Sequence, residues 1–175
     1  MNIAIIQQFR RFLFQQVLES VAVCFAAIPP AQDSGHQNSG GDGSPGGQIL
    51  FRDLKVAVAE DDELNAFVLS RMLTQSGAKV FLSRNGLELL HLVPHHQPHI
   101  IILDHHMELL DGEETLIRLK RQASTRNIPV ILITGDTDEE VRKSLDAAGA
   151  VAVLGKPVDF RALADVFQTI LNRSV

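Results

Sequence analysis

Residues 98–114 read PHIIILDHHMELLDGEE, and this stretch decides the fold class. The apolar run at 100–103 has no polar alternation, which is typical of a strand that is covered on both faces. Asp104 follows the run directly, and the Asp111-Gly112 dipeptide then supplies a turn before a helical stretch. A buried strand, a loop and a helix in this order form one unit of a parallel sheet.

The same unit occurs five times from residue 54 onward. We expect strands at 55–59, 79–82, 100–103, 130–133 and 150–153. We expect helices at 63–75, 87–92, 113–122, 138–148 and 160–171. Glycine and proline residues mark the boundaries between them. Five units predict an α/β fold with a doubly wound, five-stranded parallel sheet, because a closed barrel needs eight.

Polar side chains follow four of the expected strands. Glu60 and Asp61 follow the first strand, Asp104 the third, Thr134 the fourth and Lys156 the last. Ligands of doubly wound sheets bind outside the carboxyl ends of the strands, so we expect these side chains to converge. Clustered carboxylates repel one another unless a cation lies among them, and Mg²⁺ suits such oxygen ligands. A carboxylate held by a metal beside a lysine and a hydroxyl is suited to phosphoryl transfer.

Each of these residues also has a structural explanation when it is taken alone. Asp62 fits an N-cap, Asp111-Gly112 fits an ordinary turn, and Asp104 fits a loop acid. The conjunction favours the chemical interpretation, because four separate strand ends supply complementary groups.

The combination of these motifs resembles the receiver domain of two-component response regulators. It comprises Glu60-Asp61-Asp62, Asp104-x-x-Met107, Asp111-Gly112, Thr134-Gly135 and Lys156-Pro157. The similarity covers about residues 54–171. It implies a flavodoxin-like sheet in the strand order 2-1-3-4-5, which agrees with the strands expected from hydropathy.

The resemblance also implies a role for each matching residue. Asp104 would be the phosphoacceptor and a Mg²⁺ ligand. Asp61 would be the main direct Mg²⁺ ligand, Glu60 would act through water, and the backbone carbonyl of His106 would supply a further ligand. Such a module is a phosphoacceptor and not an enzyme, with at most self-catalysed phosphorylation and dephosphorylation.

The remaining matches concern the switch and the partners. Thr134 would be the switch hydroxyl, and Lys156 would contact the phosphoryl group beside a candidate cis peptide to Pro157. The phosphoryl donor would be a sensor histidine kinase or a histidine phosphotransfer protein in the cytoplasm. The run Glu60-Asp61-Asp62-Glu63-Leu64-Asn65 resembles in particular the receivers of hybrid sensor kinases.

The sequence departs from the family pattern at three positions. Glu108 stands where proline is usual, and Leu110 stands where methionine is usual. Val153 occupies the aromatic switch position, three residues before Lys156. Without a large ring to couple to the hydroxyl, we expect a receiver that passes its phosphate on.

Leu64 and Phe67 are candidate docking residues for a partner. In a helix at 63–75, the face formed by Asn65, Val68, Leu69 and Met72 should pack on the sheet. Leu64 and Phe67 then point elsewhere, near the acidic residues, where they could bind the histidine-bearing helix of the donor. Burial at the rim of the domain is the alternative.

The histidines favour structural or surface roles over a transition-metal site. His95 and His99 have i, i+4 spacing, but Pro94 and Pro98 argue against a helix there. His106 lies two residues after Asp104 and borders the expected site.

Composition limits the remaining choices. The 175 residues carry a net charge of −5, which disfavours coating of nucleic acid by charge alone, and we expect no nucleic-acid partner. The one cysteine, Cys24, excludes a disulfide-stapled scaffold and multi-cysteine zinc sites.

The sequence divides into three segments. Residues 49–175 form the receiver domain, and 33–48 are a flexible linker that contains six of the 12 glycines. We expect residues 1–32 to form a helical extension whose helix ends at Pro29-Pro30. An interfacial membrane helix and a cleaved signal peptide are the alternatives.

Two functional alternatives remain. A haloacid-dehalogenase-like phosphatase also uses a strand-end aspartate such as Asp104, but its second acid is replaced here by His106. The chain could also be a C-terminal fragment of a hybrid sensor kinase. Since nothing follows Val175, we expect no attached output domain. We expect the output instead from a separate protein, from the first 53 residues or from a parent sensor kinase.

Overall fold

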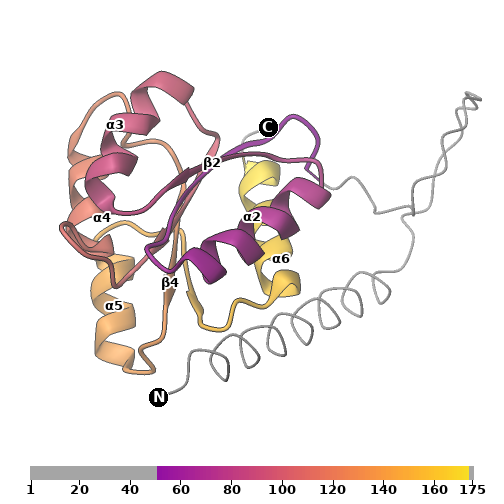
Figure 1. The fold of residues 1–175 in the computed structure, drawn as a ribbon. Helices are drawn as coiled ribbons and strands as arrows, with labels where there is room; N and C mark the ends of the chain where they lie inside the picture. The colour runs from indigo at the N-terminus through magenta and orange to yellow at the C-terminus, as the bar shows by residue number, and fades with distance from the viewer. Residues whose placement is uncertain (1–50, 174–175) are drawn as a thin grey trace, which may run out of the picture. The chain divides into compact units, whose positions relative to one another are not determined.

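The computed structural model describes residues 51–173, which form a five-stranded parallel sheet with helices on both faces (Figure 1). The strands are β1 (Lys55–Ala59), β2 (Lys79–Ser83), β3 (Ile100–Asp104), β4 (Val130–Thr134) and β5 (Ala152–Gly155). Their order is β2-β1-β3-β4-β5, which confirms the predicted doubly wound topology. The expected N-terminal extension and linker lie outside the described residues.

Five helices cover the sheet. They are α2 (Glu63–Gln75), α3 (Gly86–His96), α4 (Gly112–Arg121), α5 (Glu139–Ala147) and α6 (Phe160–Arg173). Helices α2 and α6 lie on one face, and α3, α4 and α5 lie on the other (Figure 1). None of the helices within 51–173 is long and apolar enough to cross a bilayer.

Burial differs between the central and the edge strands. Every residue of β3 and β4 is buried, as the unbroken apolar runs of these strands predict. The edge strands β2 and β5 each keep at least one exposed residue. The core between β1, β3 and β4 and the helices α3 to α5 is aliphatic, which fixes the sheet as a rigid platform for the loops at its ends.

Acidic and amide side chains begin four of the helices. Asp62, Asn85 and Asp111 each accept a hydrogen bond from the backbone N–H three residues later, at 2.8–2.9 Å. Asp138 caps α5 by accepting from the N–H of Glu140 at 2.8 Å. Such caps typically contribute about 1 kcal/mol each. The interpretation of Asp62 as an N-cap is therefore confirmed, and Asp111, interpreted as part of an ordinary turn, also proves to be an N-cap.

The prediction that α3 ends before Pro94 is wrong. The helix continues through Pro94 to His96, and Gln97 closes it in a left-handed conformation by donating its N–H to the Val93 carbonyl at 2.9 Å. Proline is tolerated here because it lies in the last turn and removes one helical hydrogen bond. His99 lies beyond the helix, where its Nδ1 accepts the Lys55 N–H at 3.1 Å. His95 and His99 therefore do not share a helix face.

Strand β5 begins two residues later than predicted. Ala150 belongs to the turn that closes α5, because its N–H donates to the Leu145 carbonyl at 3.2 Å. Val151 then donates to the Val130 carbonyl at 2.9 Å, and the paired strand begins at Ala152. Hydropathy alone does not distinguish these alanine and valine residues from strand residues.

Candidate functional site

The carboxyl edge of the sheet gathers the polar residues predicted for the site. Asp104 and Thr134 are the last residues of β3 and β4. Glu60 follows β1 directly, and Lys156 follows β5 directly. Because β1, β3, β4 and β5 are neighbours and run parallel, their four ends meet at one edge.

We call Glu60, Asp61, Asp104 and Lys156 the acidic pocket. The Lys156 ammonium lies 2.7 Å from Asp104 Oδ2 and 3.1 Å from Glu60 Oε2. The side chains of Glu60 and Asp104 are only 4% and 3% exposed. Asp104 Oδ1 is buried and has no hydrogen-bond partner among the described residues. One lysine therefore serves two buried carboxylates, and one carboxylate oxygen remains unpaired.

Burial and neighbouring charges together shift the pKa values of Glu60 and Lys156 upward. Burial, and then the negative charge of Asp104, raises the pKa of Glu60 above its usual value, although Lys156 and Asn65 oppose the shift. Burial alone would lower the pKa of Lys156, but its hydrogen bonds to Asp104 and Glu60 outweigh burial and raise it. The pocket therefore favours the charged form of Lys156 and disfavours the ionised form of Glu60 relative to the same groups in water.

The acidic pocket suits a hard divalent cation. Glu60, exposed Asp61 and Asp104 each offer a carboxylate oxygen, and these atoms lie within 4.8 Å of one another. The unpaired Asp104 Oδ1 is a second indication, since a buried carboxylate oxygen is normally hydrogen-bonded or bound to a metal. Both observations fit Mg²⁺, which prefers oxygen ligands and retains waters of its own.

Gly112 holds the loop after β3 against the pocket. Its N–H donates to the His105 carbonyl at 2.8 Å. A Cβ at this position would collide with the carbonyl oxygen of Asp104 and would lie 2.8 Å from the Cα of His105. Glycine therefore permits the close approach of the α4 N-terminus to the residues that follow the candidate phosphoacceptor.

A second polar group lies beside Thr134, and we call its members His105, His106 and Asp136 the histidine cluster. Thr134 Oγ1 accepts the Asp136 N–H at 3.0 Å, and it lies 3.2 Å from His105 Nδ1. Asp136 Oδ2 lies 3.2 Å from His105 Nδ1 and 2.7 Å from His106 Nε2. The hydrogen bond from His106 is the main reason that the pKa of Asp136 is lowered.

The sequence places His105 and His106 directly after the third expected strand, and His106 was expected to border the site, but Asp136 was not predicted to lie there. The signal that could have found it is positional. His105 follows the last residue of β3 and Asp136 lies two residues after the end of β4, so adjacent parallel strands bring them together. His106 follows in the same loop, and its side chain is 67% exposed and turned toward Asp136.

The other predicted residues lie as follows. The Lys156-Pro157 peptide bond is cis, the isomer that the resemblance implied. Val153 is buried in β5, and its carbonyl accepts a hydrogen bond from Arg142 at 2.6 Å. On α2, Phe67 is 49% exposed and Leu64 is half-buried. Helix α2 packs chiefly through Leu69, Met72 and Leu73, whereas Asn65, predicted to face the sheet, is exposed.

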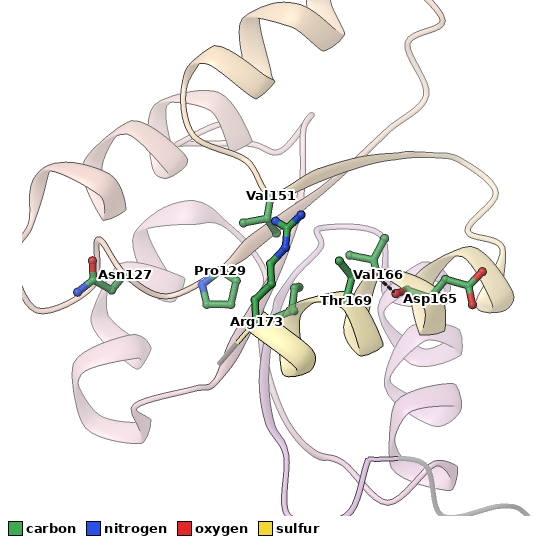
Figure 2. A pocket seen from close by; sticks show the side chains of 8 residues that line it. Asn127, Pro129, Val151, Asp165, Val166, Thr169 and Arg173 are labelled. Atoms are coloured by element: carbon green, nitrogen blue, oxygen red, sulfur yellow. Dashed lines mark hydrogen bonds between the residues drawn. The ribbon is translucent and has the colours of Figure 1, made fainter. Parts of the chain in front are cut away.

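Figure 2 shows a pocket of about 350 Å³ at the amino ends of β4 and β5, whereas the acidic pocket lies at the carboxyl ends of the strands. Pro129 and Val151, which immediately precede β4 and β5, line it together with the second half of α6. Its lining contains one acid, Asp165, and one base, Arg173. The residues of the predicted phosphorylation site therefore lie at the carboxyl edge of the sheet and not in this pocket.

Comparison with known proteins identifies the family. A sequence model of the response regulator receiver domain matches residues 56–168. The autoinducer 2 sensor kinase/phosphatase LuxQ of Vibrio parahaemolyticus is 32% identical over 126 residues, which cover 72% of this chain and 15% of LuxQ. The polar-differentiation response regulator DivK of Brucella anthropi is 29% identical over 117 residues, which cover 67% of this chain and 95% of DivK.

Solved structures agree with this comparison. The receiver domain of the Francisella response regulator 1452 superposes with a TM-score of 0.66 and 26% identity, over 70% of this chain and all of that domain. The match to LuxQ spans a small part of a long protein, whereas the match to DivK spans nearly a whole one. The same domain therefore occurs within sensor kinases and as a nearly complete protein.

Proposed function

The chain belongs to the response regulator receiver domain family, and we propose that Asp104 accepts a phosphoryl group from the phosphohistidine of a sensor histidine kinase or phosphotransfer protein. The observation that carries this proposal is the state of the Asp104 carboxylate. Its Oδ2 contacts the Lys156 ammonium at 2.7 Å, and its buried Oδ1 has no hydrogen-bond partner within residues 51–173. The match of residues 56–168 to the receiver family, and His106 in place of the second acid, favour this proposal over a haloacid-dehalogenase-like phosphatase. We further propose a cytoplasmic location, as the resemblance implies.

The proposed transfer forms one bond and breaks one. Asp104 Oδ2 attacks phosphorus, the P–N bond to the donor histidine breaks, and its electron pair returns to the imidazole. The Lys156 ammonium, 2.7 Å from that oxygen, then neutralises charge on the phosphoryl oxygens. Hydrolysis by water, or transfer to a second histidine, would return the free carboxylate.

Asp61, Asp104 and the backbone carbonyl of His106 would hold Mg²⁺ directly, with Glu60 acting through water. When bound, the ion supplies positive charge that offsets the phosphoryl oxygens and the clustered carboxylates. Glu60 also contributes without the ion, because its carboxylate accepts from Asn65 Nδ2 at 3.4 Å and from Lys156. These contacts keep the lysine aimed at Asp104.

Thr134 would act as the switch. Its hydroxyl contacts the histidine cluster, and it would have to leave Asp136 Oδ2, now 3.4 Å away, to donate to a phosphoryl oxygen. Val153 offers no large ring to follow this movement. We therefore propose that the chain passes its phosphoryl group on and couples weakly to a dimerising output.

Leu64 and Phe67 are the proposed contacts for the donor's histidine-bearing helix. Both residues belong to α2 and lie within seven positions of Glu60 in the sequence. The first turn of α2 borders the acidic pocket, because Asn65 Nδ2 donates to Glu60 Oε1. Phe67 is 49% exposed, so its ring offers apolar area for contact with a partner. An apolar stripe on a partner helix could pack there and deliver its phosphohistidine to Asp104.

Intact-mass measurement after incubation with Mg²⁺ and acetyl phosphate tests the proposal. The wild-type chain should gain the mass of one phosphoryl group, and Asp104→Asn should gain none. Asp146→Asn is the matched control, because Asp146 is an exposed acid on α5. Absence of labelling in the wild type, or full labelling of Asp104→Asn, would contradict the proposal.

A further inference from the structure

We infer that His105, His106 and Asp136 form a binding site for a divalent transition-metal ion, separate from the acidic pocket. The candidate ligand atoms of these three side chains all lie within 4.8 Å of one another. Two imidazole nitrogens and one carboxylate oxygen form a ligand set that favours zinc, nickel or copper over magnesium.

The geometry is close to that of a metal centre. Zinc binds histidine nitrogen at about 2.0–2.1 Å and carboxylate oxygen at about 2.0–2.2 Å, so two ligands of one tetrahedral ion lie about 3.3 Å apart. His105 Nδ1 lies 3.2 Å from Asp136 Oδ2, and His106 Nε2 lies 2.7 Å from the same oxygen. A small outward movement of His106 would therefore admit the ion.

The two histidine rings already converge. Their centroids lie 4.2 Å apart with an interplanar angle of 40°, and a nitrogen of each ring is directed at the same carboxylate oxygen. The His106 side chain is 67% exposed and that of His105 is 11% exposed. One ligand is thus held by packing, while the other is accessible to an ion from solvent. Three protein ligands would leave a position for water.

Two elements hold the ligands in place. Asp136 is fixed by its N–H bond to Thr134 Oγ1 at 3.0 Å, and His105 is fixed by its N–H bond to the Ile133 carbonyl at 2.8 Å. Both anchors, Ile133 and Thr134, lie at the end of β4, every residue of which is buried. Preorganised ligands bind a metal more tightly because less freedom is lost on binding.

An ion in the histidine cluster would compete with Thr134 for the same atoms. Thr134 Oγ1 lies 3.2 Å from His105 Nδ1 and 3.4 Å from Asp136 Oδ2. Both of these atoms would become ligands of the ion. The ion would therefore free the threonine hydroxyl. Any effect on phosphorylation rests on the proposed function, whereas binding of the ion does not.

The site is tested by calorimetric titration of the full chain with ZnCl₂ in excess Mg²⁺ and without a phosphoryl donor. Excess Mg²⁺ occupies the acidic pocket, so zinc reports on the histidine cluster. The wild type should bind one Zn²⁺ that His106→Gln and Asp136→Asn weaken at least about tenfold, since even indirect supports of metal ligands are worth about 10–100-fold. His95→Gln, on exposed His95, is the matched control and should bind like the wild type.

Cobalt provides a second readout. Co²⁺ should give intense visible absorption, typical of low coordination with nitrogen ligands, in the wild type and in Asp61→Asn, but not in His106→Gln. Circular dichroism should show that all the variants are folded. The inference is wrong if the wild type does not bind Zn²⁺, if His106→Gln and Asp136→Asn bind it unchanged, or if Asp61→Asn removes the binding.

Discussion

The acidic pocket and the histidine cluster lie at the same edge of the sheet, yet they differ in the ratio of carboxylates to basic groups and in the burial of their carboxylates. In the acidic pocket, one ammonium faces two carboxylates that are almost fully buried, and Asp104 Oδ1 remains unpaired. In the histidine cluster, two imidazoles face the single carboxylate of Asp136, whose side chain is 38% exposed. The first group is unsatisfied without a further cation, and the second is internally hydrogen-bonded.

The difference begins with two adjacent residues. Asp104 and His105 lie next to each other at the end of β3, where successive side chains point to opposite sides. Asp104 turns toward Lys156 and Glu60, and His105 turns toward Thr134 and Asp136. One strand end therefore supplies two sites of different ligand chemistry. The Thr134 hydroxyl contacts the histidine cluster and is the proposed switch for phosphorylation of Asp104, so a change at one site can alter the other.

The largest expected effect is that of removing the shared cation. Lys156→Met should slow labelling by acetyl phosphate about 100–1,000-fold, the typical cost of losing one group that stabilises developing charge. Quench-flow or timed intact-mass measurements would provide the rate. Lys143→Met, on exposed Lys143 of α5, should label at the wild-type rate. An undiminished rate in Lys156→Met would show that the contact with Asp104 is unimportant for the reaction.

Gly112→Ala should disturb both polar groups at once. The new Cβ would meet the backbone of Asp104 and His105, and overpacking of this kind costs about 1–3 kcal/mol of unfolding free energy. Urea denaturation measures the loss. Gly135→Ala is the control, since a Cβ at Gly135 has nothing within 4 Å. Equal stability of the two variants would contradict the close approach of α4 to the loop.

Glu60→Gln should stabilise the Mg²⁺-free chain at neutral pH while weakening Mg²⁺ binding. The raised pKa of Glu60 means that the folded chain holds this proton more tightly than the unfolded chain. Stability from this group is therefore present at low pH and is lost as the pH rises from the usual glutamate pKa through the raised one.

The substitution should remove that loss and raise the unfolding free energy at pH 7 by on the order of 1 kcal/mol. Urea denaturation between pH 4 and pH 8, in chelator, measures the change. Glu140→Gln, on exposed Glu140 in the first turn of α5, is the control. A Glu60→Gln chain that is less stable than the wild type at pH 7 would contradict the interpretation that the pocket disfavours the ionised carboxylate of Glu60.

Phe67→Ala should produce the smallest effect and should separate docking from chemistry. Transfer from a phosphorylated histidine donor should slow about fivefold to tenfold, because truncating a central interface residue costs about 1 kcal/mol or more. Labelling by acetyl phosphate should not change, since this donor needs no docking helix. Leu87→Ala, on α3, is a matched exposed apolar control. Unchanged transfer in Phe67→Ala would disprove the proposed docking contact.

Much of this account could be predicted from sequence, because it depends on local patterns. The apolar runs at β3 and β4 and the residues that follow them predicted the sheet and the convergence of Glu60, Asp104, Thr134 and Lys156. Strand-end position also places His105 and Asp136 near each other, but it does not predict that His105 Nδ1 and His106 Nε2 both contact Asp136 Oδ2, because that depends on side-chain directions. The continuation of α3 through Pro94 was missed because the position of proline within a last turn depends on the cap at Gln97.

The most direct test of the central claim is to locate the phosphoryl group after labelling with acetyl phosphate and Mg²⁺. Sodium borohydride reduces an aspartyl phosphate to homoserine, which tandem mass spectrometry of the peptides can assign to one residue. The account predicts homoserine at position 104 and at no other position. Homoserine at position 61, or an unreduced phosphoryl group on His105 or His106, would contradict it.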